Sequence, residues 1–201
     1  GWMKLKPWPP RSTPMVEVYL RQLREPDVAQ LPTIVTGYTT DEKYAIHKDE
    51  TETETAVTLK LVTLPTPRTI SYDHLDEEEL DRLAVIIAEG TSLGAFADGQ
   101  LVGVAIAGAE AWNRSLRVWE FHVIESLRGQ GIGRQLMEQM VATAVSHNLR
   151  VIVCETQSSN VPAIRAYRKL GFVLDAIDLS FYSNEDVKNE SVAVFMKRYI
   201  P

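Results

Sequence analysis

A glycine-rich segment places the strongest constraint on how this chain can fold. The segment LRGQGIGRQL spans residues 127–136 and carries glycine at positions 129, 131 and 133. A strand pattern precedes it and an amphipathic helix pattern follows it, so the glycines lie where a strand leads into a helix. Helix N-termini carry unpaired N–H donors and a partial positive charge, and glycines let the backbone wrap an anion there. The residues alone favour a phosphate-binding loop, with a tight strand-to-helix turn as the alternative.

The spacing of the glycines excludes two familiar nucleotide-binding motifs. A dinucleotide-binding fold needs G-x-G-x-x-G, and a Walker loop needs G-x-x-x-x-G-K-[ST]. Here Gly133 is followed by Arg134 and Gln135, with no lysine next to a hydroxyl residue. The pattern is instead R-x-x-G-x-G, running from Arg128 to Gly133.

A second block of sequence supports the same interpretation. Residues 160–172 read N-x-P-A-x-x-x-Y-x-K-x-G-F, which predicts a short helix capped by Asn160 and stopped by Gly171. Together the two blocks resemble the GNAT N-acetyltransferases, whose first block is an acyl-CoA pyrophosphate loop. The resemblance implies an α/β (α+β) GNAT fold, a mixed twisted β-sheet flanked by helices, with splayed central strands that hold acetyl-CoA.

The rest of the chain alternates between strand and helix patterns. Strands are predicted at residues 16–23, 49–64, 92–110 (a hairpin around Asp98-Gly99), 116–124, 150–155, 172–182 and 191–200. Helices are predicted at residues 25–35, 73–90, 131–149 and 160–171, and a proline-rich loop at 65–73. The order of elements after residue 116 indicates a mixed α/β sheet.

The strand predicted at residues 116–124 leads into the glycine loop, so the faces on which its side chains lie matter for the site. Strict alternation would place Trp119, Phe121 and Val123 on one face of the sheet. Glu120 and His122 would then point to the other face.

Composition narrows the class of protein further. The 201 residues are 45% hydrophobic, which suits one globular domain, expected over residues 16–201 after an N-terminal arm or tag remnant at 1–15. No apolar run approaches the roughly 20 residues of a membrane span, so no membrane partner is expected. The net charge of -6 argues against a nucleic-acid partner. The single cysteine rules out an internal disulfide and favours the cytoplasm. The sequence does not decide whether the protein forms a homodimer.

A closer resemblance lies within the family. WN at residues 112–113, CETQSSNVPAIRAYRKLGF at 154–172 and IDLSFYSN at 177–184 look like the streptothricin acetyltransferase group. This resemblance implies direct acetyl transfer from acetyl-CoA to a primary amine, either a streptothricin-like antibiotic or another small cationic amine. Two alternatives remain: a protein N-terminal or lysine acetyltransferase of the same fold, and a non-catalytic acyl-CoA-binding module. This resemblance covers roughly residues 94–196, and it is not recognised in the first ninety or so residues.

The resemblance also implies which residues contact acetyl-CoA. The main chain of Phe121, His122 and Val123 would hold the acetyl group and the pantetheine arm, and its amides would polarise the thioester carbonyl. Asn160 matches an asparagine that contacts the cofactor, although a plain helix N-cap explains it equally well. The pyrophosphate would lie on a loop formed by Arg128, Gly129, Gln130, Gly131, Ile132, Gly133 and Arg134. No metal is expected.

The chemistry needs a base and an acid. A free alkylamine is protonated at neutral pH, so a group must remove its proton, and Glu120 and Glu155 are the candidates. Each could instead orient the substrate or face solvent. Tyr167 is expected to be the general acid, because it matches the family's acid and lies about two helical turns after Asn160. Its alternative role is packing.

Four further side chains complete the expected site and its surroundings. Asp178 and Tyr182 could line the acceptor side, with ordinary strand-end residues as the alternative. The side chain of His122 is expected to be packed. Cys154 lies in an apolar run and is expected to be a buried residue without a chemical role.

Overall fold

The computed structural model describes residues 17–73 and 75–201, so the arm expected at residues 1–15 lies outside the described residues. The strands are β1 (Val18–Gln22), β2 (Gly37–Glu50), β3 (Thr55–Ser71), β4 (Leu93–Ala97), β5 (Gln100–Glu110), β6 (Ser115–Val123), β7 (Val151–Gln157), β8 (Val173–Asp178) and β9 (Ala193–Tyr199). The α-helices are α1 (Glu77–Ala88), α2 (Ile132–Ser146) and α3 (Val161–Lys169). Two 3₁₀ helices are η1 (Glu25–Thr33) and η2 (Glu125–Leu127).

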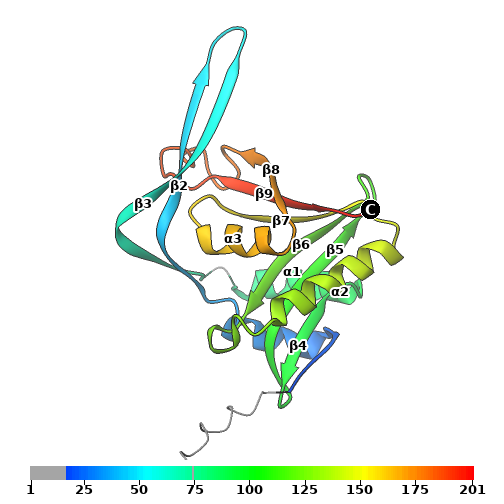
Figure 1. Ribbon diagram of the computed structural model, residues 1–201. Coiled ribbons are helices and arrows are strands. Elements are labelled where there is room, and N and C mark those ends of the chain that lie inside the picture. The colour runs from blue at the N-terminus through cyan, green and yellow to red at the C-terminus, as the bar shows by residue number, and fades with distance from the viewer. Residues whose placement is uncertain (1–16, 74) are drawn as a thin grey trace, which may run out of the picture.

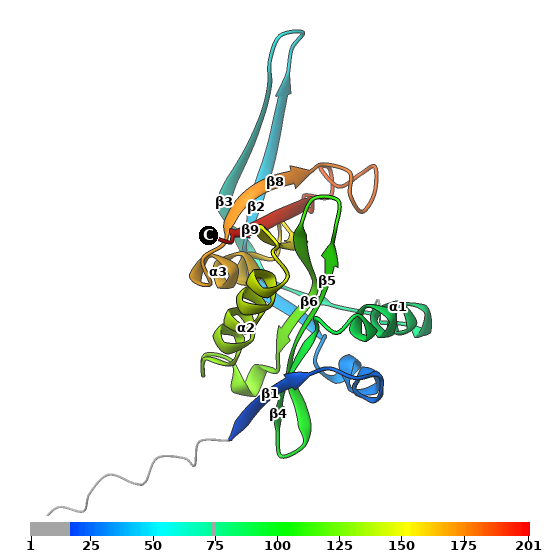
Figure 2. The same ribbon diagram turned by 90° about the vertical axis from the view of Figure 1, so that its right-hand side faces the viewer.

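Seven of the described strands form one sheet in the order β1-β4-β5-β6-β7-β9-β8. Strands β6 and β7 run parallel, and the other neighbours in this sheet are antiparallel. Helices α2 and α3 cover one face of the sheet, while α1 and η1 cover the other (Figures 1 and 2). The predicted fold, a mixed sheet flanked by helices, is confirmed.

Strand β5 joins the two halves of the core. Ala105 and Ala107 belong to the apolar cluster under α2 and α3, whereas Val104 and Ile106 belong to the cluster under α1 and η1. All four side chains are fully buried. A strand buried on both faces reads as a continuous apolar run, which is the pattern that β5 shows.

Two predictions for the first half of the chain are wrong. The run at residues 49–64 is not a single strand, because a turn at residues 51–54 separates β2 from β3. The proline-rich segment at residues 65–73 is not a loop, because β3 continues to Ser71. Together β2 and β3 form a separate two-stranded sheet.

The prolines of β3 coincide with an irregularity in its pairing with β2. Glu42 pairs with Thr63 and Thr40 pairs with Arg68, so residues 64–67 lie opposite a single residue of β2. Proline cannot donate a ladder hydrogen bond and is tolerated at such a bulge. The strand therefore continues through a sequence that reads as a loop.

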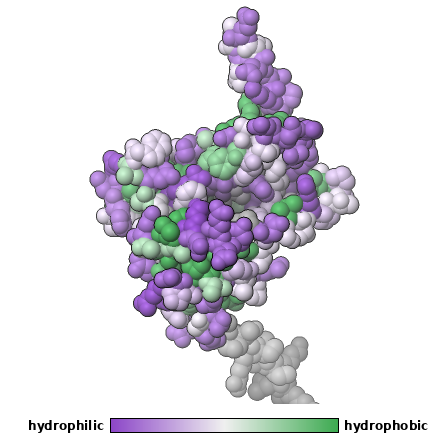
Figure 3. All heavy atoms as spheres, turned by 180° about the vertical axis from the view of Figure 1, so that it is seen from behind, coloured by the Kyte–Doolittle hydropathy of each residue, from purple (hydrophilic) through white to green (hydrophobic). Residues whose placement is uncertain are grey.

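The β2–β3 hairpin projects from the body of the molecule (Figure 1). Its far end is hydrophilic on the face seen in Figure 3. Its base is anchored near α3, where Tyr44 N donates to the Ser158 carbonyl (3.2 Å) and Arg168 Nη1 donates to the Tyr44 hydroxyl (2.9 Å). Arg165 of α3 also pairs with Glu42 at 2.5 Å. Strand β2 thus packs against α3.

A bulge in β6 corrects the predicted alternation of its side chains. Ile106 pairs with Glu120 and Ala107 pairs with Val118, so Trp119 has no partner in β5. The Trp119 ring lies under the Arg82 guanidinium of α1, 4.8 Å from it. Phe121, in contrast, packs on the α2 and α3 side. Trp119 therefore does not share a face with Phe121 and Val123.

The predicted N-cap of α3 is confirmed. The Asn160 side chain accepts a hydrogen bond from Ala163 N (3.2 Å), which makes it the N-cap of α3. Asp76 caps α1 in the same way. The strand predicted at residues 172–182 stops earlier, because the Asp178 carboxylate accepts from Ser180 N and turns the chain. Within the described part of the chain, every helix is too short or too polar to cross a membrane.

Candidate active site

The central feature of the candidate site is a gap between β6 and β7. The two strands pair from Ser115 with Val151 to Val118 with Cys154, and no pairing between them continues beyond that point. Residues 120–123 of β6 and 155–157 of β7 still pair on their outer sides, with β5 and β9. The two strands therefore splay apart, as the resemblance implies.

Peptide groups of β6 face this gap. Ile124 N donates to the Val102 carbonyl of β5 (2.9 Å), so residue 124 directs its N–H towards β5. Hydrogen-bonding directions alternate along an antiparallel strand. We infer that Phe121 and Val123 direct their main-chain groups away from β5, into the gap. An inserted extended chain would find hydrogen-bonding partners there.

The glycine loop lies at the start of α2, after the short helix η2 that the sequence did not reveal. Gly129 and Gly131 have φ angles of +77° and +89°, in the region that favours glycine. A Cβ atom at either position would meet no atom within 4 Å. The tight-turn interpretation explains the positive φ angles. The free space beside the backbone is what a bound ligand needs.

The donors of the loop are available for an anion. The first hydrogen bond of α2 runs from Gln135 N to the Gly131 carbonyl (3.0 Å), so the N–H groups of residues 132–134 have no acceptor within the helix. Arg128 Nε donates to the Val123 carbonyl (3.0 Å), which ties the loop to the end of β6. The residues present therefore fit a pyrophosphate group next to the strand gap.

Tyr167 of α3 lies at the apex of the gap. Its ring packs between Phe121 (5.9 Å between centroids) and Phe172 (5.5 Å), and only 7% of the residue is exposed. It lies next to Cys154, the last β7 residue that pairs with β6, and both residues belong to the apolar cluster under α2 and α3. Burial raises the pKa of Tyr167 well above its usual value, so the phenol stays protonated. Burial also raises the pKa of the Cys154 thiol, which keeps it un-ionised.

The Asn160 side chain makes two hydrogen bonds within the protein. Its Oδ1 caps α3, and its Nδ2 donates to the Tyr72 hydroxyl at 3.1 Å. The N-cap interpretation is therefore confirmed, while a contact with the cofactor stays a prediction. Tyr72 follows β3, so this bond links the start of α3 to the base of the hairpin.

A polar cluster gathers on the opposite face of the gap from α2 and α3. His122 Nε2 lies 2.7 Å from Glu120 Oε2. The Tyr72 ring stands edge-on to the His122 ring, with 6.1 Å between centroids. On β7, the Glu155 carboxylate accepts a hydrogen bond from the Tyr182 hydroxyl. The structure thus brings together four of the predicted residues, His122, Glu120, Glu155 and Tyr182, and adds Tyr72.

Asp178 and Tyr72 show the limits of the sequence prediction at this cluster. The Asp178 carboxylate is engaged by its own turn at Ser180, so it binds the local backbone instead of the cluster. The backbone N–H of Tyr182 donates a hydrogen bond to the Asp186 carboxylate at 2.8 Å, which fixes the position of Tyr182. Tyr72 carries no sequence signal, since it reaches the site only when the hairpin packs against α3.

The environment of Glu155 disfavours its charge. Burial raises the pKa of the Glu155 carboxyl above its usual value, and the Tyr182 hydrogen bond and the nearby Arg117 offset this only in part. Glu120 adds to the rise through charge repulsion. Ionised Glu155 therefore destabilises the folded protein, a situation that is common at functional sites.

Glu155→Gln should accordingly raise the free energy of unfolding at neutral pH. The folded-state pKa lies above the unfolded one, so the destabilisation is present when pH exceeds the folded pKa and vanishes below the unfolded pKa. The melting temperature should exceed that of the wild type at about pH 7.5 and match it at about pH 4. Glu52→Gln, in the exposed hairpin turn, is the control and should change neither. Equal melting temperatures of Glu155→Gln and wild type at pH 7.5 would contradict the assigned environment.

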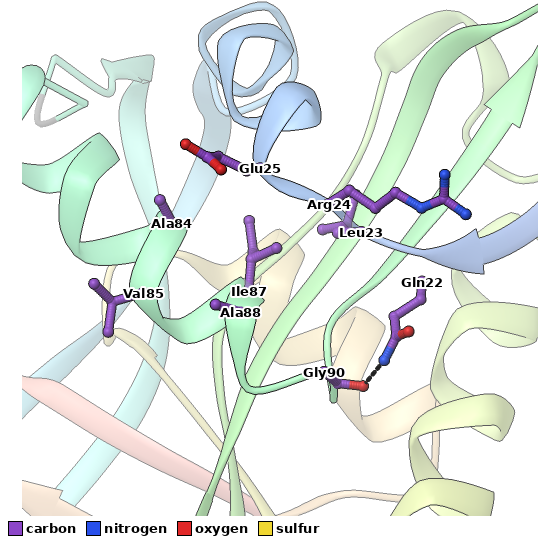
Figure 4. A pocket seen from close by; sticks show the side chains of 9 residues that line it. All are labelled: Gln22, Leu23, Arg24, Glu25, Ala84, Val85, Ile87, Ala88 and Gly90. Atoms are coloured by element: carbon purple, nitrogen blue, oxygen red, sulfur yellow. Dashed lines mark hydrogen bonds between the residues drawn. The ribbon is translucent and has the colours of Figure 1, made fainter.

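Metal binding and the surface hollow are separate from the candidate residues. Among residues 17–73 and 75–201, no three His, Cys, Asp or Glu side chains gather closely enough to hold a metal ion. A shallow hollow lies between the start of η1 and the end of α1 (Figure 4). Its lining consists of Gln22, Leu23, Arg24, Glu25, Ala84, Val85, Ile87, Ala88 and Gly90.

Comparison with known proteins defines the class. A family model described as the acetyltransferase (GNAT) family matches residues 56–172, more than half of the chain. The chain therefore belongs to the GNAT acetyltransferase family, and the predicted family is confirmed.

Individual relatives narrow the comparison. The streptothricin acetyltransferase of Streptomyces lavendulae is 34% identical over 105 residues, which are 52% of this chain and 55% of that relative. The match thus spans little more than half the length of that enzyme. The crystal structure of a nourseothricin acetyltransferase superposes with a TM-score of 0.72 and 26% identity, covering 92% of this chain and 99% of the other.

A further structure, from Bacillus anthracis str. Ames, shares the fold and was solved in complex with acetyl coenzyme A. Its TM-score is 0.70 at 21% identity, with 92% of this chain and 99% of that chain covered.

Proposed function

We propose that the chain is an acetyl-CoA-dependent N-acetyltransferase that moves the acetyl group directly to a primary amine. One observation carries the proposal. The gap between β6 and β7 is bordered by the free N–H groups of the α2 loop and Tyr167 on one face of the sheet, and by the carboxylates on the other. A cofactor and an acceptor entering from opposite faces would meet inside the gap.

The cofactor side uses main-chain groups. The N–H groups at the start of α2 would bind the pyrophosphate, with Arg128 holding the loop against β6. The peptide groups of Phe121 and Val123 that face the gap would bind the pantetheine arm and polarise the carbonyl oxygen. Acetyl-CoA, when bound, supplies an activated thioester.

Proton donation and proton removal would take place on opposite faces of the gap. Tyr167, protonated and next to the apex, would give a proton to the departing sulfur. Glu120 and Glu155 would serve in removing the proton from the amine, directly or through a neighbouring group, and in holding the amine in place. Cys154 needs no role, because direct transfer requires no protein nucleophile.

The acceptor that this site favours is a small cationic amine. Glu155 and Glu120 offer negative charge, while the rings of Tyr72 and Tyr182 offer faces to which a cation is attracted. The names of the relatives point to a streptothricin-like antibiotic, so antibiotic resistance is part of the proposal. A cytoplasmic location belongs to the proposal as well, in keeping with the single unpaired cysteine.

Release of free CoA in the presence of a panel of amines tests this function. The panel should contain streptothricin, polyamines, peptides with free N-termini and lysine-containing peptides. We expect turnover with small cationic amines, with kcat/KM falling as salt rises, because charge steers the acceptor to the site. Preference for peptides would favour the protein acetyltransferase alternative. Binding of CoA without turnover of any amine would leave the acyl-CoA-binding module.

A further inference from the structure

The side chains of His122 and Glu120 form a close pair on the face of the sheet opposite α2 and α3. Nε2 of His122 lies 2.7 Å from Oε2 of Glu120. Both side chains are largely buried, with 17% of His122 and 10% of Glu120 exposed. Among residues 17–73 and 75–201, Nδ1 of His122 makes no hydrogen bond. One ring nitrogen is thus held and the other is left for a ligand.

The position of the pair places it at the reacting atoms. His122 lies between Phe121 and Val123, whose peptide groups face the gap, in the part of β6 beyond its pairing with β7. Its side chain points to the face of the sheet opposite Tyr167. An amine that approaches from that face would meet the imidazole before it reaches the gap.

We propose that His122 is the general base of the acetyl transfer and that Glu120 is its positioning residue; the inference rests on the proposed function. Glu120 accepts the hydrogen bond from Nε2–H, which fixes the tautomer with an unprotonated Nδ1. A carboxylate orients a catalytic imidazole and stabilises the imidazolium in this way in other enzymes. Glu120 has only a small exposed fraction and reaches the acceptor through His122.

Two protons leave the amine during the transfer. Nδ1 of His122 takes one proton from the ammonium group, directly or through one water, and later passes it to solvent. The neutral nitrogen attacks the carbonyl carbon, the C–N bond forms, and the nitrogen loses a second proton. The C–S bond breaks and Tyr167 gives its proton to the sulfur, after which the second proton from the nitrogen restores the phenol.

Glu155 then has the complementary task of holding the acceptor. Its carboxylate is engaged with the Tyr182 hydroxyl and lies on the neighbouring strand, across the gap from His122. Within the part of the chain that the structure describes, the charged and titratable groups next to the pair include Tyr72 after β3, Glu155 on β7 and Arg82 on α1.

His122→Gln is the first test, because the glutamine amide can still donate to Glu120 while the base is removed. With the panel amine that reacts fastest, kcat should fall about 10²-fold and the acidic limb of the pH–rate profile assigned to His122 should disappear. The affinity for acetyl-CoA, measured by calorimetry, should stay unchanged. His147→Gln, at the exposed end of α2, is the matched control.

Glu120→Gln is the second test, and it separates positioning from mere structure. Loss of the carboxylate should leave the imidazole without its orienting acceptor, so kcat should fall while the affinity for acetyl-CoA stays unchanged. Nitrogen NMR of the imidazole gives a readout independent of activity. It should show the Nε2–H tautomer of His122 near neutral pH in the wild-type protein, and a mixture of the two tautomers in Glu120→Gln.

Two results would overturn this assignment while leaving the proposed function intact. One is a normal kcat with an unchanged acidic limb in His122→Gln. The other is an Nδ1–H tautomer of His122 in the wild-type protein. If the wild-type protein acetylates no amine in the panel, both the proposed function and this inference are wrong.

Discussion

Tyr167→Phe is expected to lower kcat by about 10²-fold or more. The substitution keeps the ring that packs between Phe121 and Phe172 and removes only the hydroxyl at the apex of the strand gap. The departing sulfur would then leave without a proton donor. The affinity for acetyl-CoA and the melting temperature should stay close to those of the wild type.

The control for this change is Tyr199→Phe on β9. Its hydroxyl bonds to Asp175 on the exposed surface, so the same chemical change should leave kcat unaltered. The rate must be measured where chemistry, and not product release, is limiting. An unchanged kcat in Tyr167→Phe under those conditions would reduce Tyr167 to a packing residue.

Gly131→Asp is expected to weaken acetyl-CoA binding by about 10²-fold, as befits the loss of charge-assisted hydrogen bonds. The new carboxylate would project from the loop at the start of α2, among the N–H donors assigned to the pyrophosphate. A Cβ atom there meets nothing within 4 Å, so the fold should survive. Calorimetric titration with acetyl-CoA measures the loss.

Gly99→Asp separates this electrostatic effect from backbone strain. Gly99 has a φ angle of +77°, near the +89° of Gly131, and its Cβ position is equally free. It lies in the β4–β5 turn, which contributes none of the candidate site residues. Both variants should lose similar stability, and only Gly131→Asp should lose affinity. Normal binding by Gly131→Asp would show that the loop does not hold the cofactor.

Local patterns in the sequence predicted α2, its glycine loop and α3 well. The helix α2 and its loop follow from glycine spacing and an amphipathic stripe, and α3 follows from Asn160 and Gly171. These signals lie within a few residues of one another, so they need no tertiary information. The resemblance then supplied the splay of β6 and β7, which no local pattern reveals.

The bulge in β6 marks a limit of pattern reading. Strict alternation places Trp119 with Phe121, but the extra residue moves Trp119 to the side of α1. A bulge depends on how two strands pair, so the sequence of one strand does not announce it. The alternation of Glu120 and His122 beyond the bulge was predicted correctly.

The acceptor side was predicted only in part, because it is assembled from distant segments. Tyr72 follows a proline-containing strand that reads as a loop, and it meets Asn160 only through tertiary packing. Burial in the folded protein raises the pKa of Glu155, which the sequence alone does not show. Asp178 accepts a hydrogen bond within its own turn, and its predicted contact with the acceptor stays a prediction. Burial and long-range pairing, and not residue type, decide these outcomes.

A single-turnover experiment with acetyl-CoA labelled in the acetyl group tests direct transfer most simply. The protein is mixed with labelled acetyl-CoA and a reactive amine from the panel, and protein and amine are analysed by mass spectrometry over time. We predict that the label passes to the amine nitrogen in step with CoA release and never appears on the protein. Label on Cys154 or any other residue before it reaches the amine, or bound acetyl-CoA that never loses its label, would contradict the account.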